Sequence, residues 1–345
     1  MALSTPLKDL RVGVIGAGFG QQVHVPVFNQ IPKCEVVAIC AQTQEKADRV
    51  ARQSGVAKGY ANWQQLIEME RPDILSIATP PGLQYEIAKF AIRRGIALFC
   101  EKPLALNATQ SRELTQLSHT LPAMVDFEFP EIPAFKKCHE LVSAGGIGPI
   151  RSIDVQWTLQ TYANQHGLVS WKTTTSEGGG ALFAFGSHVF YYLEWLLGPI
   201  RTISARLAGS RPGNDTLVTV KVNFENGAEG SIRIDTNDPS RSQHSISVQG
   251  SDGNLLLQNL GKDHISGFDL YSEGGLKIDL KPADGATLDG RISAVTPLAA
   301  RLVRWINGGL ISAPNLTNGH RVQTLIEASL QSNSNGSGEV GVSSL

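Results

Sequence analysis

One residue of this chain, Lys102, combines reactive chemistry with a setting that holds it in place. It follows the apolar run Ile96–Cys100, which is too short and too poor in helical periodicity to be anything but a buried strand. A lysine there lies at the carboxyl edge of a parallel sheet, where open α/β folds bind ligands. Because Pro103 ends the strand and fixes the chain direction, we expect the ammonium to project from a stiff corner that begins at Glu101.

A second motif, near the N-terminus, predicts a turn that binds phosphate. The apolar run Val12–Ile15 precedes Gly16-Ala17-Gly18, as a strand precedes the glycine-rich turn of a dinucleotide site. Gly16 would make the tight turn, and Gly18 would let the backbone approach a pyrophosphate at the helix N-terminus. Gln21 stands where the motif has its third glycine. Either Gly20 replaces that glycine in part, or the helix lies slightly further out.

The next strand predicts which dinucleotide is preferred. It ends at Cys40 and is followed by Ala41, Gln42 and Thr43, and the first acid is Glu45. NAD-binding proteins of this type place a carboxylate here to hold the ribose 2′-hydroxyl. Since no carboxylate would repel a 2′-phosphate, and Gln42 and Thr43 could bind one, the sequence favours NADP over NAD.

A proline-rich loop follows a later strand. Ala78-Thr79-Pro80-Pro81 would form a rigid loop, suited to lie against the central phosphates or the nicotinamide ribose. A plain structural turn explains the same residues equally well. The predicted cofactor-binding residues are Gly16, Gly18, Phe19, Gly20, Gln21, Ala41, Gln42, Thr43, Ala78, Thr79, Pro80, Pro81, Glu101, Lys102 and Trp171.

Composition excludes several classes of protein. Thirty basic and 31 acidic residues leave a net charge of −1, so no strong positive field draws in nucleic acid. Four cysteines without metal-ligand spacing indicate buried, reduced thiols, with no disulfide and no metal site. We find no run of the ~18–20 apolar residues that a membrane span needs and no secretory signal in Met1–Leu10. The prediction is a cytoplasmic protein.

The order of elements predicts an α/β fold with two domains. Strands alternate with amphipathic helices over residues 11–125, which indicates a parallel, Rossmann-type sheet. Residues 126–345 begin with a helix and continue with alternating strands, which indicates a large, mostly antiparallel open sheet. Asn226-Gly227 between two of those strands predicts a type I′ hairpin turn. A long helix is expected around Ala181–Leu197.

These motifs together resemble the Gfo/Idh/MocA oxidoreductases over nearly the whole chain. The resemblance rests on the glycine turn, Ala78–Pro81, Cys100–Ala105, the triplet Gly178–Gly180 with His188, and Asn318–Gln323. It implies a Rossmann domain and a C-terminal α/β domain for substrate binding and oligomerisation. It also implies NAD(P)-dependent redox at a hydroxyl of a sugar, cyclitol or nucleotide sugar, in a homodimer or homotetramer built through the C-terminal sheet.

The resemblance also assigns roles at the reacting centre. Lys102 matches the family lysine between nicotinamide and substrate, and His188 matches the histidine that exchanges the hydroxyl proton. An imidazole suits that step because its pKa lies near neutral pH, and an ammonium stabilises a developing alkoxide. The predicted substrate-binding residues are Lys102, Trp171, Lys172, His188 and Tyr191.

Departures from the family pattern keep a second function open. Ala184 stands where the family often has an aspartate, one helical turn before His188, and Tyr191 stands where a second acid is common. Tyr191, Tyr192 or Glu194 would have to replace those carboxylates, and Gln84 occupies a position often held by histidine. The sequence therefore predicts an NAD(P)-dependent dehydrogenase or reductase acting on CH–OH groups. The alternative is a non-catalytic, NAD(P)-binding sensor or regulator with the same fold.

Overall fold

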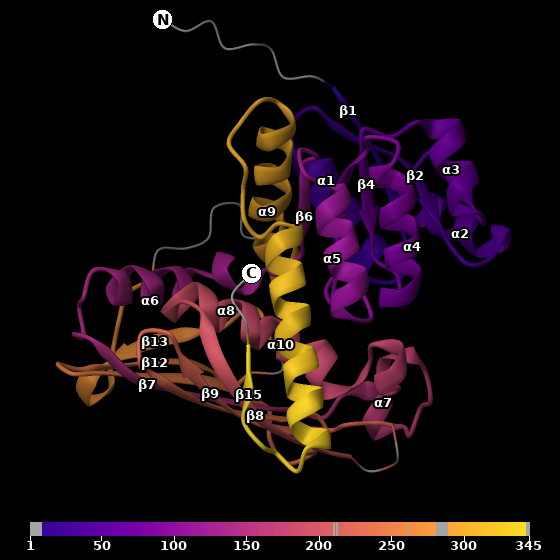
Figure 1. Cartoon of the computed structure of the whole chain (residues 1–345). Coiled ribbons are helices and arrows are strands. Elements are labelled where there is room, and N and C mark those ends of the chain that lie inside the picture. The colour runs from indigo at the N-terminus through magenta and orange to yellow at the C-terminus, as the bar shows by residue number, and fades with distance from the viewer. Residues whose placement is uncertain (1–8, 210, 212, 262, 281–288, 343–345) are drawn as a thin grey trace, which may run out of the picture. The chain divides into compact units, whose positions relative to one another are not determined.

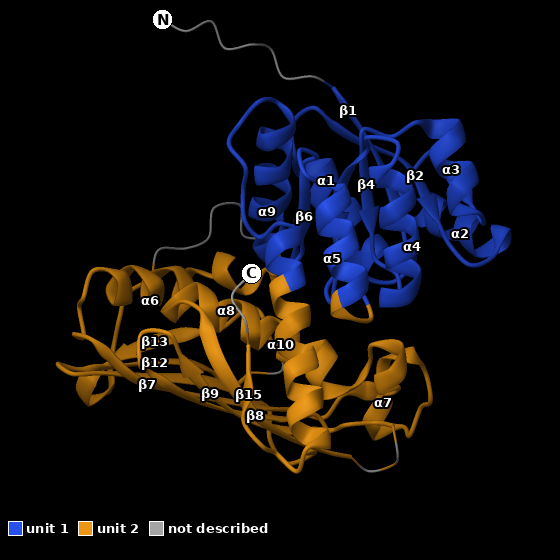
Figure 2. Cartoon of the chain, in the orientation of Figure 1, with its two compact units in different colours: residues 1–105, 109–126, 291–320 blue, residues 106–108, 127–290, 321–345 orange. Residues whose placement is uncertain are grey.

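The chain forms two compact units in the computed structural model (Figures 1 and 2), which describes residues 9–209, 211, 213–261, 263–280 and 289–342. The first unit holds residues up to 105, residues 109–126 and residues 291–320. The second holds residues 106–108, 127–290 and 321–345.

The first unit is built on a six-stranded parallel sheet in the order β3-β2-β1-β4-β5-β6. The order reverses between β1 and β4, and dinucleotides bind outside the carboxyl ends of the strands at such a point. The strands are β1 (Leu10–Ile15), β2 (Cys34–Cys40), β3 (Lys58–Tyr60), β4 (Ile74–Ile77), β5 (Ala97–Cys100) and β6 (Ala123–Val125). The helices are α1 (Val25–Gln30), α2 (Gln44–Ser54), α3 (Trp63–Glu70), α4 (Pro81–Ile92), α5 (Ala108–Leu117) and α9 (Gly290–Ile306).

The core of this unit corrects the predicted division of the chain at residue 125. Val295, Leu298 and Leu302 of α9 are fully buried in the same apolar cluster as Val12 and Phe99 of the sheet. A segment that begins 165 residues after the end of β6 (290 − 125) therefore completes the Rossmann core. Because local patterns carry no information about such a return of the chain, the sequence predicted one boundary where the structure has several.

The second unit is built on a nine-stranded, mostly antiparallel sheet in the order β14-β13-β12-β11-β7-β10-β9-β8-β15. Helices α6, α8 and α10 lie on one face of it (Figure 1). The helices are α6 (Pro133–Ser143), α7 (Tyr162–Gln165), α8 (Ser187–Leu197) and α10 (Leu316–Ser334), whose first residues belong to the first unit. The strands are β7 (Ile150–Thr158), β8 (Ile200–Ala208), β9 (Leu217–Phe224), β10 (Glu229–Asp235), β11 (Gln243–Gly250), β12 (Asn254–Asn259), β13 (Asp269–Ser272), β14 (Leu276–Lys277) and β15 (Val340–Gly341).

The predicted fold class is confirmed, and two local predictions need correction. The β9–β10 hairpin forms, but Gly227 has a positive φ and Asn226 does not, whereas a type I′ turn needs both. Glu225, Asn226 and Gly227 form a three-residue loop, closed by a bond from the Phe224 N–H to the Ala228 carbonyl. The helix expected over Ala181–Leu197 begins with a π turn, Leu182–Gly186, before α8.

Three further predictions concern a secretory signal, membrane-spanning segments and the state of the cysteines. Residues 1–8 lie outside the described part of the chain, so the absence of a secretory signal stays a prediction. Among the described residues, no helix is both long and apolar enough to cross a membrane. All four cysteines are free, and three of them are buried.

The return of α9 to the Rossmann core can be tested by a truncation. Leu302→Ala removes a side chain with no exposed surface and should lower the free energy of unfolding of the first unit by about 2–5 kcal/mol, the usual cost of such a cavity. Leu310→Ala is the matched control, because Leu310 is 93% exposed and should change stability by less than about 0.5 kcal/mol. Denaturant unfolding measures both; equal stabilities would contradict the packing of α9.

Candidate active site

The turn after β1 has the geometry that a pyrophosphate needs. Gly16 has a φ of +123°, and a Cβ there would lie 2.2 Å from the Ala78 carbonyl oxygen. A Cβ on Gly18 would meet no atom within 4 Å, so the backbone at Gly18 is open to a ligand. One on Gly20 would lie 3.0 Å from Cγ1 of Val14. Gly20 therefore takes the packing role of the missing third glycine, as the first of the two alternatives predicted.

A π turn, Gly20–His24, follows and leads into α1. A π turn accommodates one extra residue in a helix, so it offsets the early position of Gly20. Gln21, on this turn, donates a hydrogen bond to Gln53 Oε1 at 3.3 Å.

The loop after β4 lies at the same edge of the sheet. Thr79 Oγ1 is buried and has no hydrogen-bond partner among the described residues, and Pro81 begins α4. Buried hydroxyls are normally paired, so this one fits a ligand group that would complete its hydrogen bond. Together with the open backbone at Gly18, it shows that the residues present suit a dinucleotide.

The end of β2 carries no carboxylate. Ala41 is buried and donates its N–H to the Tyr60 carbonyl oxygen. Gln42 is exposed, and Thr43 caps α2 by accepting a hydrogen bond from the Lys46 N–H at 3.2 Å. The three residues that directly follow β2 therefore offer no carboxylate, as the sequence indicated.

Lys102 lies at the carboxyl end of β5, as predicted, in a corner that a buried glutamine holds. Gln84 Nε2 donates to the carbonyl oxygens of Glu101 at 2.6 Å and Pro103 at 3.0 Å. The Lys102 N–H donates to Oε2 of Glu101 at 3.2 Å. Gln84 thus fixes the backbone on both sides of Lys102. This is the structural contribution of the glutamine at a position where the resemblance led us to expect a histidine.

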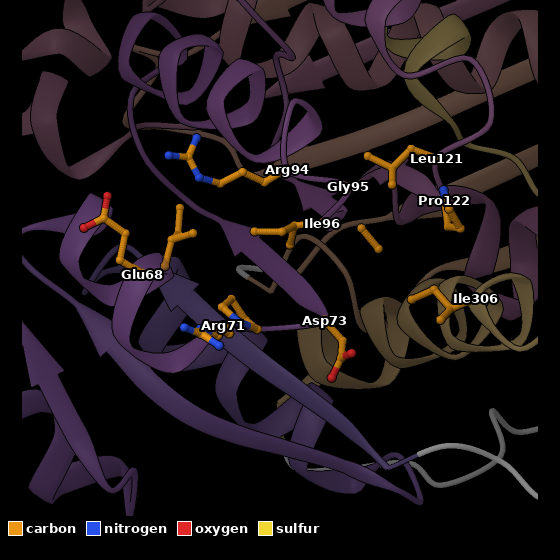
Figure 3. A pocket seen from close by; sticks show the side chains of 12 residues that line it. Glu68, Arg71, Asp73, Arg94, Gly95, Ile96, Leu121, Pro122 and Ile306 are labelled. Atoms are coloured by element: carbon orange, nitrogen blue, oxygen red, sulfur yellow. The ribbon is translucent and has the colours of Figure 1, made fainter.

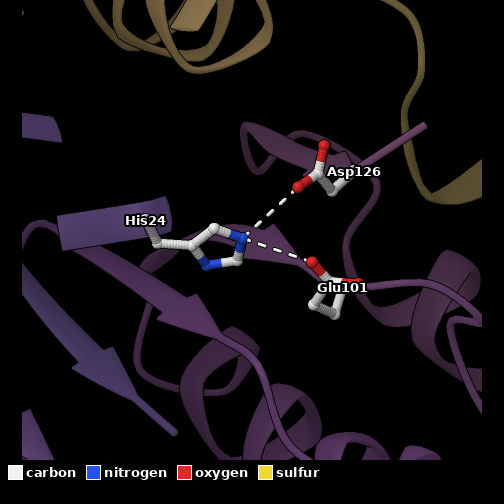
Figure 4. A group of neighbouring side chains, drawn as sticks. All are labelled: His24, Glu101 and Asp126. Atoms are coloured by element: carbon white, nitrogen blue, oxygen red, sulfur yellow. Dashed lines mark hydrogen bonds and ion pairs between the residues drawn. The ribbon is translucent and has the colours of Figure 1, made fainter. Parts of the chain in front are cut away.

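Two groups that sequence reasoning did not select, His24 and Asp126, meet Glu101 beside this corner (Figure 4). His24 Nε2 lies 3.3 Å from Oδ2 of Asp126 and 3.4 Å from Oε1 of Glu101. Burial alone would lower the pKa of His24, but hydrogen bonds to the two carboxylates and their charges raise it to about 9. Burial raises the pKa of Asp126, against the effect of His24. No local pattern links these residues, which lie up to 102 positions apart.

His188, in the second unit, is buried near the start of α8 and is next to a carboxylate. Its Nδ1 lies 3.6 Å from Oε2 of Glu128, and the ring of Phe129 packs edge-on at 5.0 Å. Tyr191 stacks on Phe127 with ring centroids 4.5 Å apart. An acid beside His188 is thus present, but it comes from the segment after β6.

Glu128 is the acid that lies beside His188, and two of the three candidates that the sequence offered contact other residues. Glu194 pairs with Arg321 at 2.8 Å, and the Tyr192 hydroxyl lies 3.1 Å from His244 Nε2. The expected aspartate position, Ala184, falls within the π turn, so it does not have the one-turn relation to His188 that an α-helix would give. The sequence feature that could have pointed to Glu128 is its position as an acidic residue shortly after the end of β6.

The glycine triplet before His188 lets its backbone pack closely against the Trp171 backbone and the Asp215 side chain. A Cβ on Gly179 would lie 2.0 Å from the Trp171 carbonyl oxygen, and one on Gly180 would lie 2.0 Å from Oδ1 of Asp215. Asp215 Oδ2 accepts a hydrogen bond from the Leu182 N–H at 2.7 Å at the start of the helix. Trp171 is half-buried and Lys172 is exposed, with its Nζ 5.8 Å from the Trp171 ring.

A cavity of about 710 Å³ in the first unit lies at the wrong edge of the sheet for this chemistry (Figure 3). Asp73, Ile96 and Pro122 line it, and each directly precedes a strand. The predicted cofactor residues follow strand ends instead.

Comparison with known proteins agrees with this arrangement. The family described as "Oxidoreductase family, NAD-binding Rossmann fold" matches residues 10–129, and the "GFO/IDH/MocA C-terminal domain" matches residues 135–256. The chain belongs to the Gfo/Idh/MocA family. It is an oxidoreductase that binds NAD(H), of the dehydrogenase type that acts on CH–OH groups.

Two curated members of the Gfo/Idh/MocA family illustrate the relationship. An uncharacterized oxidoreductase of Synechocystis is 30% identical, with 95% of each chain covered. Levoglucosan dehydrogenase of Pseudarthrobacter phenanthrenivorans is 27% identical, with 75% of this chain and 76% of that protein covered. A solved structure of levoglucosan dehydrogenase with NADH and levoglucosan has a TM-score of 0.83 at 24% identity, covers 97% and 100% of the two chains, and shows the same fold.

Membership of the family favours the enzyme over the sensor, because the related proteins named here are dehydrogenases or oxidoreductases. The oligomeric state, the cytoplasmic location and the roles of individual site residues stay predictions.

Proposed function

We propose that the protein oxidises a hydroxyl of a sugar, cyclitol or nucleotide sugar, or reduces the corresponding carbonyl, with Lys102 and His188 as catalytic residues. Oxidation converts CH–OH to C=O; the hydride goes to nicotinamide and the hydroxyl proton to the protein. The observation that carries this proposal is the corner of Lys102, which Gln84 holds at the carboxyl end of β5. Relatives named levoglucosan dehydrogenase and D-glucoside 3-dehydrogenase, both 27% identical, support a sugar-like substrate.

Each proposed catalytic residue has a distinct task. The ammonium of Lys102 stabilises negative charge on the substrate oxygen as its proton leaves. The imidazole of His188 accepts that proton, and Glu128 orients the ring and stabilises the imidazolium that forms. Trp171, Lys172 and Tyr191 belong to the proposed substrate-binding residues.

The residues that would hold the dinucleotide follow from the turns already described. Backbone at Gly16–Gln21 would bind the pyrophosphate, and Thr79 would donate its hydroxyl hydrogen. Ala41, Gln42 and Thr43 would surround the adenosine ribose, and Ala78, Pro80, Pro81 and Glu101 would border the rest of the cofactor. When bound, the nicotinamide supplies the hydride acceptor or donor.

The first test combines a substrate screen with a variant. Reduction of NAD and NADP should be followed by absorbance with levoglucosan, glucosides, inositols and nucleotide sugars. With the best substrate, Lys102→Ala should lower kcat by about two orders of magnitude, as for one lost electrostatic donor, with little change in cofactor affinity. Lys137→Ala, on the surface of α6, is the control. Undiminished turnover in Lys102→Ala would remove the lysine from the mechanism.

Glu128→Gln tests the proton acceptor and its carboxylate. It should lower kcat by about tenfold or more and move the acidic limb of the pH–rate profile to lower pH, because a nearby negative charge favours imidazolium. His188→Asn should remove both the limb and most activity, whereas Glu140→Gln, with a 67% exposed side chain, should match the parent. A limb that stays in place in Glu128→Gln would exclude Glu128 from this role.

We also propose that the protein prefers NADP to NAD. The support is the carboxylate-free end of β2, with Gln42 and Thr43 exposed next to the N-terminus of α2, where the helix dipole favours a phosphate. Fluorescence titration should show tighter binding of NADP to the parent. Ala41→Asp should reverse the order through repulsion of the 2′-phosphate, and Ala57→Asp, which adds the same charge at an exposed position, should not. Tighter binding of NAD by the parent would refute the preference.

A further inference from the structure

The cluster of His24, Glu101 and Asp126 contains more negative charge than an ordinary buried site tolerates. His24 is fully buried and Asp126 is 1% exposed. Glu101 is only partly exposed, with 16% of its side-chain surface accessible. Two carboxylates that close to one another, away from water, are strongly unfavourable unless a positive charge compensates them.

The ring orientation of His24 identifies where that positive charge must lie. Ser76 Oγ lies 2.7 Å from Nδ1, and Phe19 and Phe99 pack edge-on against the ring at 5.3 and 5.2 Å. With the ring fixed in this way, Nε2 is directed at oxygens of both carboxylates. A lone pair on Nε2 would repel those oxygens, so Nε2 carries a proton. The two negative charges beside it favour the imidazolium over a neutral ring that would accept a hydrogen bond from Ser76 at Nδ1.

A proton fits this position better than a metal ion. The three ligand atoms lie within 4.8 Å of one another, which a divalent ion could bridge. However, structural zinc sites take four protein ligands, and among the described residues this group offers three. An exchangeable ion also needs an entry path, and His24 and Asp126 are closed to solvent. A protonated ring donates to Ser76 from Nδ1 and to Asp126 from Nε2, and its charge lies 3.4 Å from Oε1 of Glu101.

Glu101 connects this cation to the residue that acts on the substrate. Its Oε1 faces His24, and its Oε2 accepts the hydrogen bond of the Lys102 N–H. Lys102 is also close enough for its charge to favour the ionised form of Asp126. The positive charges of His24 and Lys102 thus balance the two carboxylates. Without the proton on His24, the carboxylates would attract the Lys102 ammonium toward the cluster.

We propose that His24 is a permanently protonated positioning residue, whose charge compensates one of the two negative charges of Glu101 and Asp126 and so weakens the pull of these carboxylates on the Lys102 ammonium. The role of Lys102 rests on the proposed function; the protonation of His24 does not. His24 itself touches neither substrate nor cofactor in this scheme.

The protonation state can be measured in the unmodified protein. Nitrogen NMR of histidine-labelled protein should show both ring nitrogens of His24 protonated from about pH 6 to about pH 8, a range in which an ordinary histidine titrates. His320 is the internal control: it is buried, and its Nδ1 also lies 2.9 Å from a serine oxygen, that of Ser111. Burial lowers the pKa of His320, so its ring should be neutral at the upper end of this range and should lose any proton it holds below that end. A neutral His24, or stoichiometric metal by elemental analysis, would overturn the proposal.

A charge-balanced double variant tests the positioning role. His24→Gln should lower kcat by about tenfold or more and change KM and cofactor affinity by less than about threefold. His24→Gln combined with Asp126→Asn removes one charge of each sign and should recover most of the kcat. His320→Gln is the control. Equal losses in the single and double variants would show a merely structural role and overturn the proposal.

A readout that needs no turnover separates this proposal from the proposed function. Labelling of Lys102 by an amine-reactive reagent, quantified by mass spectrometry, should slow several-fold in His24→Gln and recover in the double variant, because an ammonium held by carboxylates reacts poorly. This result with an inactive parent would refute the dehydrogenase and keep the cluster. Unchanged labelling in an active enzyme would refute the cluster and keep the dehydrogenase.

Discussion

The carboxyl edge of the six-stranded parallel sheet places Gly16, Thr79, Lys102 and Asp126 within two residues of the ends of β1, β4, β5 and β6. Parallel strands point the same way, so residues that follow them meet at one edge even when they are far apart in sequence. The meeting of these residues at one edge also depends on the close contact between the backbone of Gly16 and that of Ala78. The turn at Gly16 fits only because it lacks a side chain, since a Cβ would overlap the Ala78 carbonyl.

Features set by neighbours in the sequence could be predicted, and those set by distant packing could not. Strand ends and their attached turns follow from short apolar runs, which is why Lys102 and the glycine turn were placed correctly relative to β5 and β1. The substitute role of Gly20 was also foreseen as one of two alternatives. By contrast, α9 returns to the first unit through tertiary contacts alone, and the π turns at Gly20–His24 and Leu182–Gly186 have no signature in periodicity.

The acids beside the two histidines show the same limit. A carboxylate for His188 was sought along its own helix, because i and i+4 are neighbours on an α-helix. The structure supplies it instead from Glu128, 60 positions earlier. Since buried charges need partners, a missing acid in one element is a reason to search other elements. A single sequence does not say which of them to search.

The two buried histidines differ in what surrounds them, and this difference fits different tasks. His24 faces two carboxylates and a serine, so removing its proton would leave buried negative charge without compensation. His188 faces one carboxylate at 3.6 Å, and its other close neighbours include aromatic rings. One negative charge at that distance stabilises an imidazolium less than two do. These surroundings accord with the roles proposed above, in which His24 keeps its proton and His188 accepts one from the substrate.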